Sequence, residues 1–258
     1  HTERYDTLIS RYFANRRDEG PFPTRLLLPM QKVADLRYGE NPHQRAALYR
    51  NERKLVPRES TVVKARQLHG KELSFNNYLD LNASWDIASS FAEPAVAIIK
   101  HNNPCGVAVA KKLSLAYKKA LDADRVSAFG GIIATNRPVD RETAKQITQT
   151  FMECVIAPGY QPSALAILKK KKNLRLMTMP ETPKAAKERI SLRLGAYDYK
   201  KISGGFLVQE ADTAELSVSD LRVVTKREPS LGEIQDLFFA FTVAKYVKSN
   251  AIVIARNG

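Results

Sequence analysis

The stretch VAIIKHNNPCGVAV (Val96–Val109) decides the fold of this chain and also carries its most unusual polar residues. An apolar run ends at Lys100 and His101, two asparagines and a proline follow, and a second apolar run begins after Cys105. The first run reads as a buried strand, because a strand covered on both faces need not alternate apolar and polar residues. The polar residues between the runs indicate either a turn or a site at the end of a strand.

From this stretch onward the sequence predicts an alternation of strands and helices. The expected strands are 95–100, 130–135, 153–157 and 174–179, and the expected helices are 114–123, 141–151 with Asp140 as its cap, and 162–171. This rhythm predicts an α/β fold in which helices cover an at least partly parallel sheet. Three later elements are expected: a strand with a Gly-Gly break at 202–212, a long helix at 230–250 that begins with a Ser230–Glu233 capping box, and an apolar strand in AIVIARNG at 251–258.

Composition limits the classes of function. The chain has 258 residues and 44% hydrophobic content, enough for one large domain or two small ones. It contains no run of about 18 apolar residues that would span a membrane, and its two cysteines favour a reducing, cytoplasmic setting. The net charge of +14 fits a nucleic-acid or membrane binder or an enzyme with anionic substrates. The basic run 169–172 reads as a solvated helix end, since aromatic residues do not interleave with the basic ones.

The N-terminal segment is expected to belong to a different structural unit. Residues 1–17 predict a short amphipathic helix, and Gly20, Pro21 and Pro23 then predict a linker. The continuous domain is expected from about residue 25. The apolar run and Asn-Gly turn at the other end predict that this chain is a fragment.

Four interpretations of the Lys100–His101 pair are open. Zinc deaminases use a P-C-x-x-C ligand pair, but here Pro104-Cys105 is followed by Ala108 where the second cysteine would stand. Cys105 as a nucleophile would need a lowered pKa and an orienting group, and the sequence offers no such group. An acid/base pair at the carboxyl end of a strand and a plain surface turn both remain possible.

Four other positions are candidate binding residues, each with a simpler structural alternative. Arg37 in RYGENPHQ could grip a phosphate, or the motif could be a β-turn. Phe129 in SAFGG could stack on a base, or precede a strand as part of a turn. Glu153 could bind a hydroxyl or amide, or be a solvated acid at a strand end. Asn250 could be a site residue or a helix C-cap.

Taken together, the motifs resemble those of a known family. RYGENPHQ, GKELSFNNYLD, IIKHNNPCGVAV, SAFGGIIA, VIAPGY, SGGFLVQ, LRVVTKREPS and KYVKSNAIVIARNG are similar, in this order, to motifs of the bifunctional purine-biosynthesis enzymes. These enzymes join an inosine monophosphate (IMP) cyclohydrolase domain to an aminoimidazole carboxamide ribonucleotide (AICAR) transformylase domain. The likeness runs from about residue 30 to 258. It implies that residues 1–24 are the end of the cyclohydrolase domain with its linker, and that 25–258 belong to the transformylase domain, of which the remainder is absent.

The resemblance also implies roles for individual residues. His101 resembles the general base for the substrate amine, Lys100 the group that stabilises the transition state, and Asn250 the residue that orients His101 and the carboxamide. Contacts with the AICAR nucleotide are implied for Arg37, Tyr38, Phe129, Gly130 and Glu153.

The implied reaction is transfer of a formyl group from 10-formyltetrahydrofolate, the co-substrate, to the 5-amino group of AICAR, with no metal. The implied fold is a cytidine-deaminase-like, three-layer α/β subdomain without zinc. The implied assembly is a cytoplasmic homodimer with its sites at the subunit interface, and no nucleic-acid or membrane partner. A basic nucleic-acid-binding module and a zinc deaminase relative are the alternatives.

Overall fold

The computed structural model describes residues 28–51, 61–179 and 197–258, together with Tyr5, Asp6, Ile9, Phe22 and residues 24–26. The helix predicted at 1–17 and the linker after it therefore lie almost entirely outside the described residues. Among the residues that are described, no helix is both long and apolar enough to cross a membrane.

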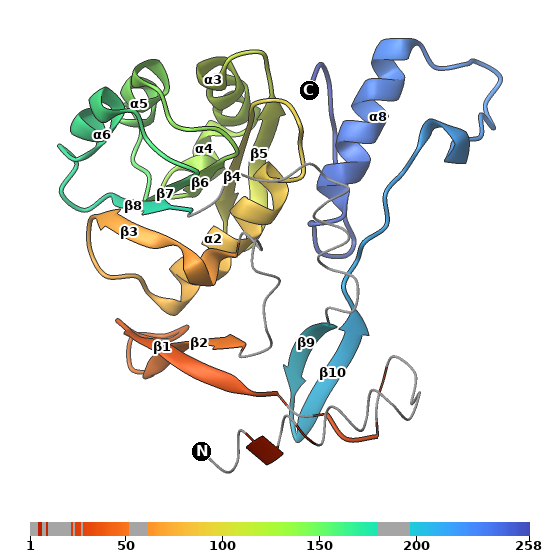
Figure 1. The fold of residues 1–258 in the computed structure, drawn as a ribbon. Helices are drawn as coiled ribbons and strands as arrows, with labels where there is room; N and C mark the ends of the chain where they lie inside the picture. The colour runs from red at the N-terminus through yellow and green to blue at the C-terminus, as the bar shows by residue number, and fades with distance from the viewer. Residues whose placement is uncertain are drawn as a thin grey trace.

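A six-stranded mixed sheet forms the centre of the protein (Figure 1). Strands β6, β7 and β8 run parallel, whereas β3, β4 and β5 each run antiparallel to their neighbour. This arrangement confirms the predicted α/β fold with a partly parallel sheet. In spatial order the strands are β3 (Arg66–His69), β8 (Arg175–Thr178), β7 (Cys154–Ala157), β6 (Ile132–Thr135), β4 (Ala95–Lys100) and β5 (Asn103–Val109).

Helices cover both faces of this sheet, so the core has two halves (Figure 1). Alternate residues of β4 serve the two halves: Val96 and Ile98 pack in one, Ala97 and Ile99 in the other. The second half is closed by α2 (Phe75–Ala88). The first is closed by α3 (Leu113–Ala123), α5 (Arg141–Ile147) and α6 (Pro162–Leu168), with the short α4 (Arg125–Ala128) beside β4 and β5.

The polar stretch around Lys100 and His101 folds as a hairpin of β4 and β5. Five residues of β4 are fully buried, and the chain reverses through His101 and Asn102, whose φ angles are 52° and 60°. Cys105 is the extra residue of a bulge, because Ile98 pairs with Gly106 and Ile99 with Pro104. The turn interpretation of this stretch is therefore correct as a description of the backbone.

Two further hairpins lie outside the central sheet. Strands β1 (Met30–Leu36) and β2 (Ala46–Asn51) are joined by the loop that contains RYGENPHQ. The motif therefore lies in a turn region, as the β-turn alternative predicted. Strands β9 (Tyr197–Ile202) and β10 (Gly205–Glu210) flank the Gly-Gly pair. The prediction of one interrupted strand was wrong here, because Gly204, with a φ of 79°, reverses the chain.

The C-terminal helix α8 (Leu231–Ala244) begins as predicted but ends earlier. Ser230 and Glu233 form the predicted capping box. Phe239 stacks on Phe91 at 5.2 Å between ring centroids, which holds the helix against the segment between α2 and β4. The short 3-10 turns are Val62–Lys64 and Val218–Asp220.

The strand predicted at 251–258 was wrong. These residues form no strand, and the side chains of Ile252 and Ile254 are 84% and 94% exposed. An apolar run becomes a strand only when another strand supplies its hydrogen bonds, and no described strand pairs with this one. The helices predicted at 141–151 and 162–171 are likewise shorter, although Asp140 caps the first one as expected, accepting from the Thr143 N–H at 2.8 Å.

Candidate functional site

The Lys100–His101 pair lies at one edge of the central sheet, at the carboxyl end of β4. Because β4 runs antiparallel to β6, this edge also holds the amino ends of β6, β7 and β8. The prediction that Lys100 and His101 stand where a strand ends is confirmed, because β4 ends at Lys100. The loops that enter β6, β7 and β8 are what surround the pair.

Lys100 is fixed toward the loop that enters β6. Its Nζ donates a hydrogen bond to the carbonyl oxygen of Phe129 at 2.9 Å. The Phe129 ring in turn lies 5.3 Å from the ring of Phe151, and the two are 57% and 51% exposed. The structure therefore places a cation beside an exposed aromatic pair, a surface on which a flat heterocycle can stack.

Gly130 completes this loop in a conformation that favours glycine. Its φ is 76°, and its N–H donates to the carbonyl oxygen of Phe151 at 2.9 Å. The N–H of Glu153 bonds the carbonyl oxygen of Gly131 at 3.0 Å, so the loops before β6 and β7 are tied together. Phe129, Gly130 and Glu153, which were singled out separately in the sequence, are neighbours in the structure.

Glu153 is oriented by two donors. Asn77 of α2 donates from Nδ2 to its Oε2 at 3.2 Å, and Arg175 lies 3.3 Å from the same oxygen through Nη1. The Arg175 side chain is only 8% exposed, and its Nε donates to the Glu72 carbonyl oxygen at 3.1 Å. The Glu153 side chain is 39% exposed, so it remains accessible while these partners fix its orientation.

The loop with Arg37 and Tyr38 docks on the start of α2, at the same corner. The Phe75 N–H donates to the Tyr38 carbonyl oxygen at 3.1 Å, and the Arg37 N–H donates to the Leu73 carbonyl oxygen at 3.3 Å. The Arg37 guanidinium is exposed and lies 5.4 Å from the centre of the Tyr38 ring. Both side chains are free of any described acidic partner and can meet an anionic ligand.

His101 occupies the exposed tip of the β4–β5 hairpin. Among the described residues, none makes a hydrogen bond to its ring. Its turn is held instead by Asp80 of α2, whose Oδ1 accepts from the Asn102 N–H at 2.7 Å. Burial raises the pKa of Asp80, whereas the hydrogen bond from Asn102 and the nearby His101 act in the opposite direction.

The structure argues against Cys105 as a nucleophile. Burial raises the pKa of this thiol, and the negative charge of Asp124 acts in the same direction. A thiol held protonated near neutral pH is a poor nucleophile. Across the described ranges, no group of three or more histidine, cysteine or acidic residues is arranged to hold a metal ion.

Asn250 lies in the segment that follows α8. No described hydrogen bond joins it to Lys100 or His101. The hydroxyl of Tyr246, four residues earlier, bonds that of Ser90 at 2.8 Å, which ties the segment after α8 to the residues that follow α2. Because α8 ends at Ala244, the C-cap alternative for Asn250 was also wrong.

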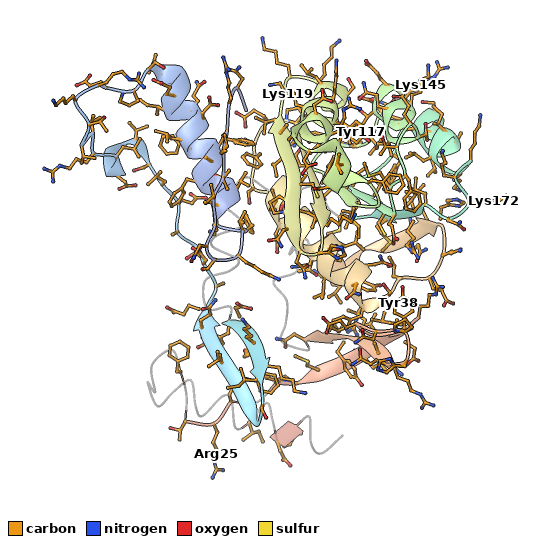
Figure 2. All side chains as sticks on the ribbon, turned by 180° about the vertical axis from the view of Figure 1, so that it is seen from behind. Arg25, Tyr38, Tyr117, Lys119, Lys145 and Lys172 are labelled. Atoms are coloured by element: carbon orange, nitrogen blue, oxygen red, sulfur yellow. The ribbon has the colours of Figure 1, made fainter. Side chains whose placement is uncertain are left out.

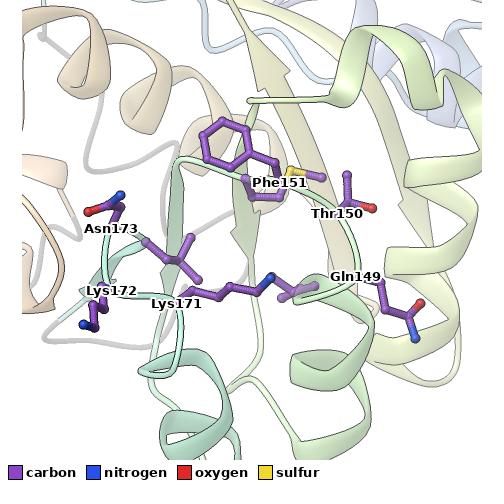
Figure 3. A pocket seen from close by; sticks show the side chains of 9 residues that line it. Gln149, Thr150, Phe151, Lys171, Lys172 and Asn173 are labelled. Carbon is purple, nitrogen blue, oxygen red and sulfur yellow. The ribbon is translucent and has the colours of Figure 1, made fainter.

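A pocket of about 250 Å³ opens next to this edge (Figure 3). The Lys171 side chain reaches across it, and Phe151 forms its far wall. It borders the site through Phe151, although none of the candidate site residues named from the sequence lines it. The other lining residues are Ile147, Gln149, Thr150, Met152, Lys172, Asn173 and Leu174.

Four contributors to this edge were not identified from the sequence: Asn77, Asp80, Phe151 and Arg175. A charged residue at the start of a buried strand was an available signal for Arg175. Asn77 and Asp80 lie within GKELSFNNYLD, which was noted only as part of the resemblance. Their spacing of three places both on one face of a helix, but the sequence does not say what that face meets.

Positive charge is spread around the molecule. Figure 2 shows Lys119, Lys145 and Lys172 pointing outward from the helical side, with Arg25 at the distant end. Lys169–Lys172 directly follow α6 and are exposed, which confirms their interpretation as a solvated helix end.

Comparisons with a family model and with individual proteins point to the same family. The AICARFT/IMPCHase bienzyme family matches residues 1–258. Three similar relatives carry the name bifunctional purine biosynthesis protein PurH: those of Acetivibrio thermocellus (47% identical over 259 residues), a Thermoanaerobacter species (47% over 258) and Oceanobacillus iheyensis (46% over 257). Each alignment covers 100% of this chain and 48% of the relative. The chain thus spans about half the length of the curated relatives it matches.

Proposed function

This chain belongs to the AICARFT/IMPCHase bienzyme family, and from that membership we propose that its Lys100–His101 edge takes part in formyl transfer from 10-formyltetrahydrofolate to AICAR. The whole protein would also close the product to IMP. The observation that carries the proposal is the gathering of dispersed sequence motifs at one sheet edge: the hairpin turn, the Phe129–Gly130 loop, Glu153 and the Arg37–Tyr38 loop.

The chemistry requires a base at the attacking nitrogen. The 5-amino group of AICAR is a weak nucleophile, because its ring withdraws electron density. His101 takes a proton from this nitrogen as the nitrogen attacks the formyl carbon. The bond between the formyl carbon and the folate nitrogen then breaks, that nitrogen gains a proton, and the products are formyl-AICAR and tetrahydrofolate. The Lys100 ammonium stabilises the negative charge that develops on the formyl oxygen and assists departure of the folate nitrogen.

The remaining residues would bind the nucleotide. Arg37 and Tyr38 contact its phosphate and ribose, Phe129 and Gly130 receive its base, and Glu153 accepts hydrogen bonds from it. Asn250 is proposed to orient His101 and the carboxamide. This role requires the segment after α8 to approach the hairpin turn, or to serve the site of another copy.

The finer assignments follow from family membership and are proposals too. Residues 1–24 would be the end of the cyclohydrolase domain with its linker, and 25–258 the transformylase part. The layered sheet would be a cytidine-deaminase-like subdomain without zinc. The protein would act in the cytoplasm as a homodimer with sites at the subunit interface, binding no nucleic acid and no membrane.

Calorimetric titration with AICAR at two salt concentrations tests the proposal. We expect stoichiometric binding that weakens only modestly between about 50 and about 200 mM salt, because one phosphate is bound. A nucleic-acid module with six to ten phosphate contacts would lose affinity by about 10³- to 10⁵-fold over that range.

Two arginine variants in the same titration locate the binding site. Arg37→Ala should weaken AICAR binding by about 10- to 100-fold, the usual cost of a charged hydrogen bond. Arg50→Ala is the matched control, because Arg50 belongs to the same hairpin but bonds Gln31 at 2.8 Å. Absence of AICAR binding by the folded full-length protein, or equal effects of both variants, would contradict the proposed site.

A further inference from the structure

The carboxylate of Asp80 has no role in the residue assignments above, yet it is the side chain that secures the turn under His101. It lies in the second turn of α2, and its Oδ1 accepts the Asn102 N–H at 2.7 Å. Asn102 directly follows His101 in the turn. One carboxylate of α2 therefore anchors the tip of the hairpin through the Asn102 N–H.

That turn needs an anchor because of its backbone conformation. His101 and Asn102 have φ angles of 52° and 60°. Two-residue hairpin turns with both residues in this region strongly favour glycine, asparagine and aspartate, since side chains are crowded there. His101 is thus held in a region that few non-glycine residues adopt, although histidine tolerates it better than most, and such a conformation persists when surrounding contacts impose it.

The orientation of His101 depends on this backbone anchor more than on its ring. No hydrogen bond from the described residues reaches the ring, so no second side chain fixes the imidazole directly. The backbone of the two-residue turn sets the direction of the His101 Cα–Cβ bond, and so the region that the imidazole can reach. α2 also orients Glu153 through Asn77, three residues before Asp80, so one helix face sets both.

We propose that Asp80 is a positioning residue, which holds the left-handed His101–Asn102 turn so that the imidazole faces the substrate amine. This inference rests on the proposed formyl transfer. It assigns Asp80 no contact with either substrate. For this role the negative charge of Asp80 matters less than the presence of a side-chain oxygen, because the oxygen is what accepts the backbone N–H of the turn.

Three variants of the full-length protein test this. Asp80→Ala removes the acceptor, and kcat for formyl transfer should fall by up to about 100-fold, the effect of displacing a catalytic group by about 1 Å, while KM for AICAR changes little. Asp80→Asn keeps an oxygen of the same shape and should retain most of the activity. In Asp80→Ala/Asn102→Gly, glycine at the second turn position forms this turn more readily than asparagine does and should restore part of kcat.

Asp86→Ala is the matched control, because Asp86 lies on the same helix and its side chain bonds Asn82 instead of the turn. It should keep wild-type kcat. The proposal is overturned if Asp80→Ala retains wild-type kcat, if Asp80→Asn is as impaired as Asp80→Ala, or if Asn102→Gly restores nothing.

Amide hydrogen exchange separates failure of this inference from failure of the proposed function. The Asn102 N–H should be protected in the wild type and in Asp80→Asn, and exposed in Asp80→Ala. If the wild-type protein transfers no formyl group, the proposed function is wrong, and this exchange pattern still decides whether Asp80 holds the turn. Equal protection in all three proteins would refute the anchoring itself.

Discussion

At the scale of single residues, the candidate site is organised by groups that do not themselves look catalytic. Arg175 and Asn77 hold Glu153, and Lys100 is aimed by the carbonyl oxygen of Phe129. His101 stands apart, because its position comes from the backbone of its turn. The residues named from the sequence are exposed or half-buried, whereas Arg175 and Asn77 are buried. Burial of such polar partners pre-organises the side chains that remain accessible.

Cys105 offers a prediction at this scale. Burial raises its pKa, so the thiol is protonated and takes no part in the proposed chemistry. Cys105→Ser should therefore keep kcat for formyl transfer close to the wild-type value, measured at about pH 7.5 with saturating AICAR. A loss of activity in Cys105→Ser beyond about tenfold would restore the nucleophile interpretation.

The other cysteine, Cys154, should resist thiol reagents until the protein unfolds, because burial raises its pKa to about 12.

At the scale of elements, the sequence predicted the features that depend on residues close together in the chain. It missed those that depend on pairing with a distant strand. The capping residues Ser230 and Asp140 were identified because a cap bonds the backbone three residues away. The run 251–258 has the composition of a strand, but whether a strand forms depends on a neighbour that the run itself does not specify. The Gly-Gly pair at 204–205 was recognised as a break in a strand. Whether such a pair only interrupts a strand or reverses the chain into a hairpin depends on its backbone conformation, which the sequence does not show.

The contact between β5 and α3 supplies a second prediction. A Cβ on Gly106 would lie 1.9 Å from the Ala120 carbonyl oxygen, so helix and strand would have to separate. Gly106→Ala should lower the free energy of unfolding by about 1–3 kcal/mol, as overpacking does. Urea unfolding followed by fluorescence of Trp85, the single tryptophan of the sequence and buried in the core, measures this.

Gly159→Ala is the control for that measurement, because no other group lies within 4 Å of the position that the added methyl carbon would take. It should change the free energy of unfolding by no more than about 0.5 kcal/mol. Equal unfolding midpoints for the Gly106 and Gly159 variants would show that the close approach of α3 to β5 is not needed for stability.

At the scale of the whole molecule, the alternation of strands and helices predicted the layers, and the order of motifs indicated the family. The order of the strands in the sheet could not be predicted from the sequence. β4 pairs with both β5 and β6 and runs antiparallel to each, a pairing that the alternation of strands and helices does not reveal. This antiparallel pairing brings the end of β4 to the amino ends of β6, β7 and β8, where loops from distant parts of the chain meet. Lys100, His101, Phe129, Gly130 and Glu153 could be named individually, but their meeting at one edge follows only from the topology.

The central claim is that His101 acts as the base for formyl transfer at this edge. The most direct measurement is kcat for formyl transfer by His101→Ala in the full-length protein, with AICAR affinity determined by calorimetry on the same preparation. His69→Ala is the control, since the His69 ring lies 3.3 Å from the Lys171 carbonyl oxygen and away from the hairpin turn. We predict that His101→Ala lowers kcat by at least about 100-fold, the contribution of a general base, and leaves AICAR affinity nearly unchanged. Wild-type turnover by His101→Ala would contradict the assignment.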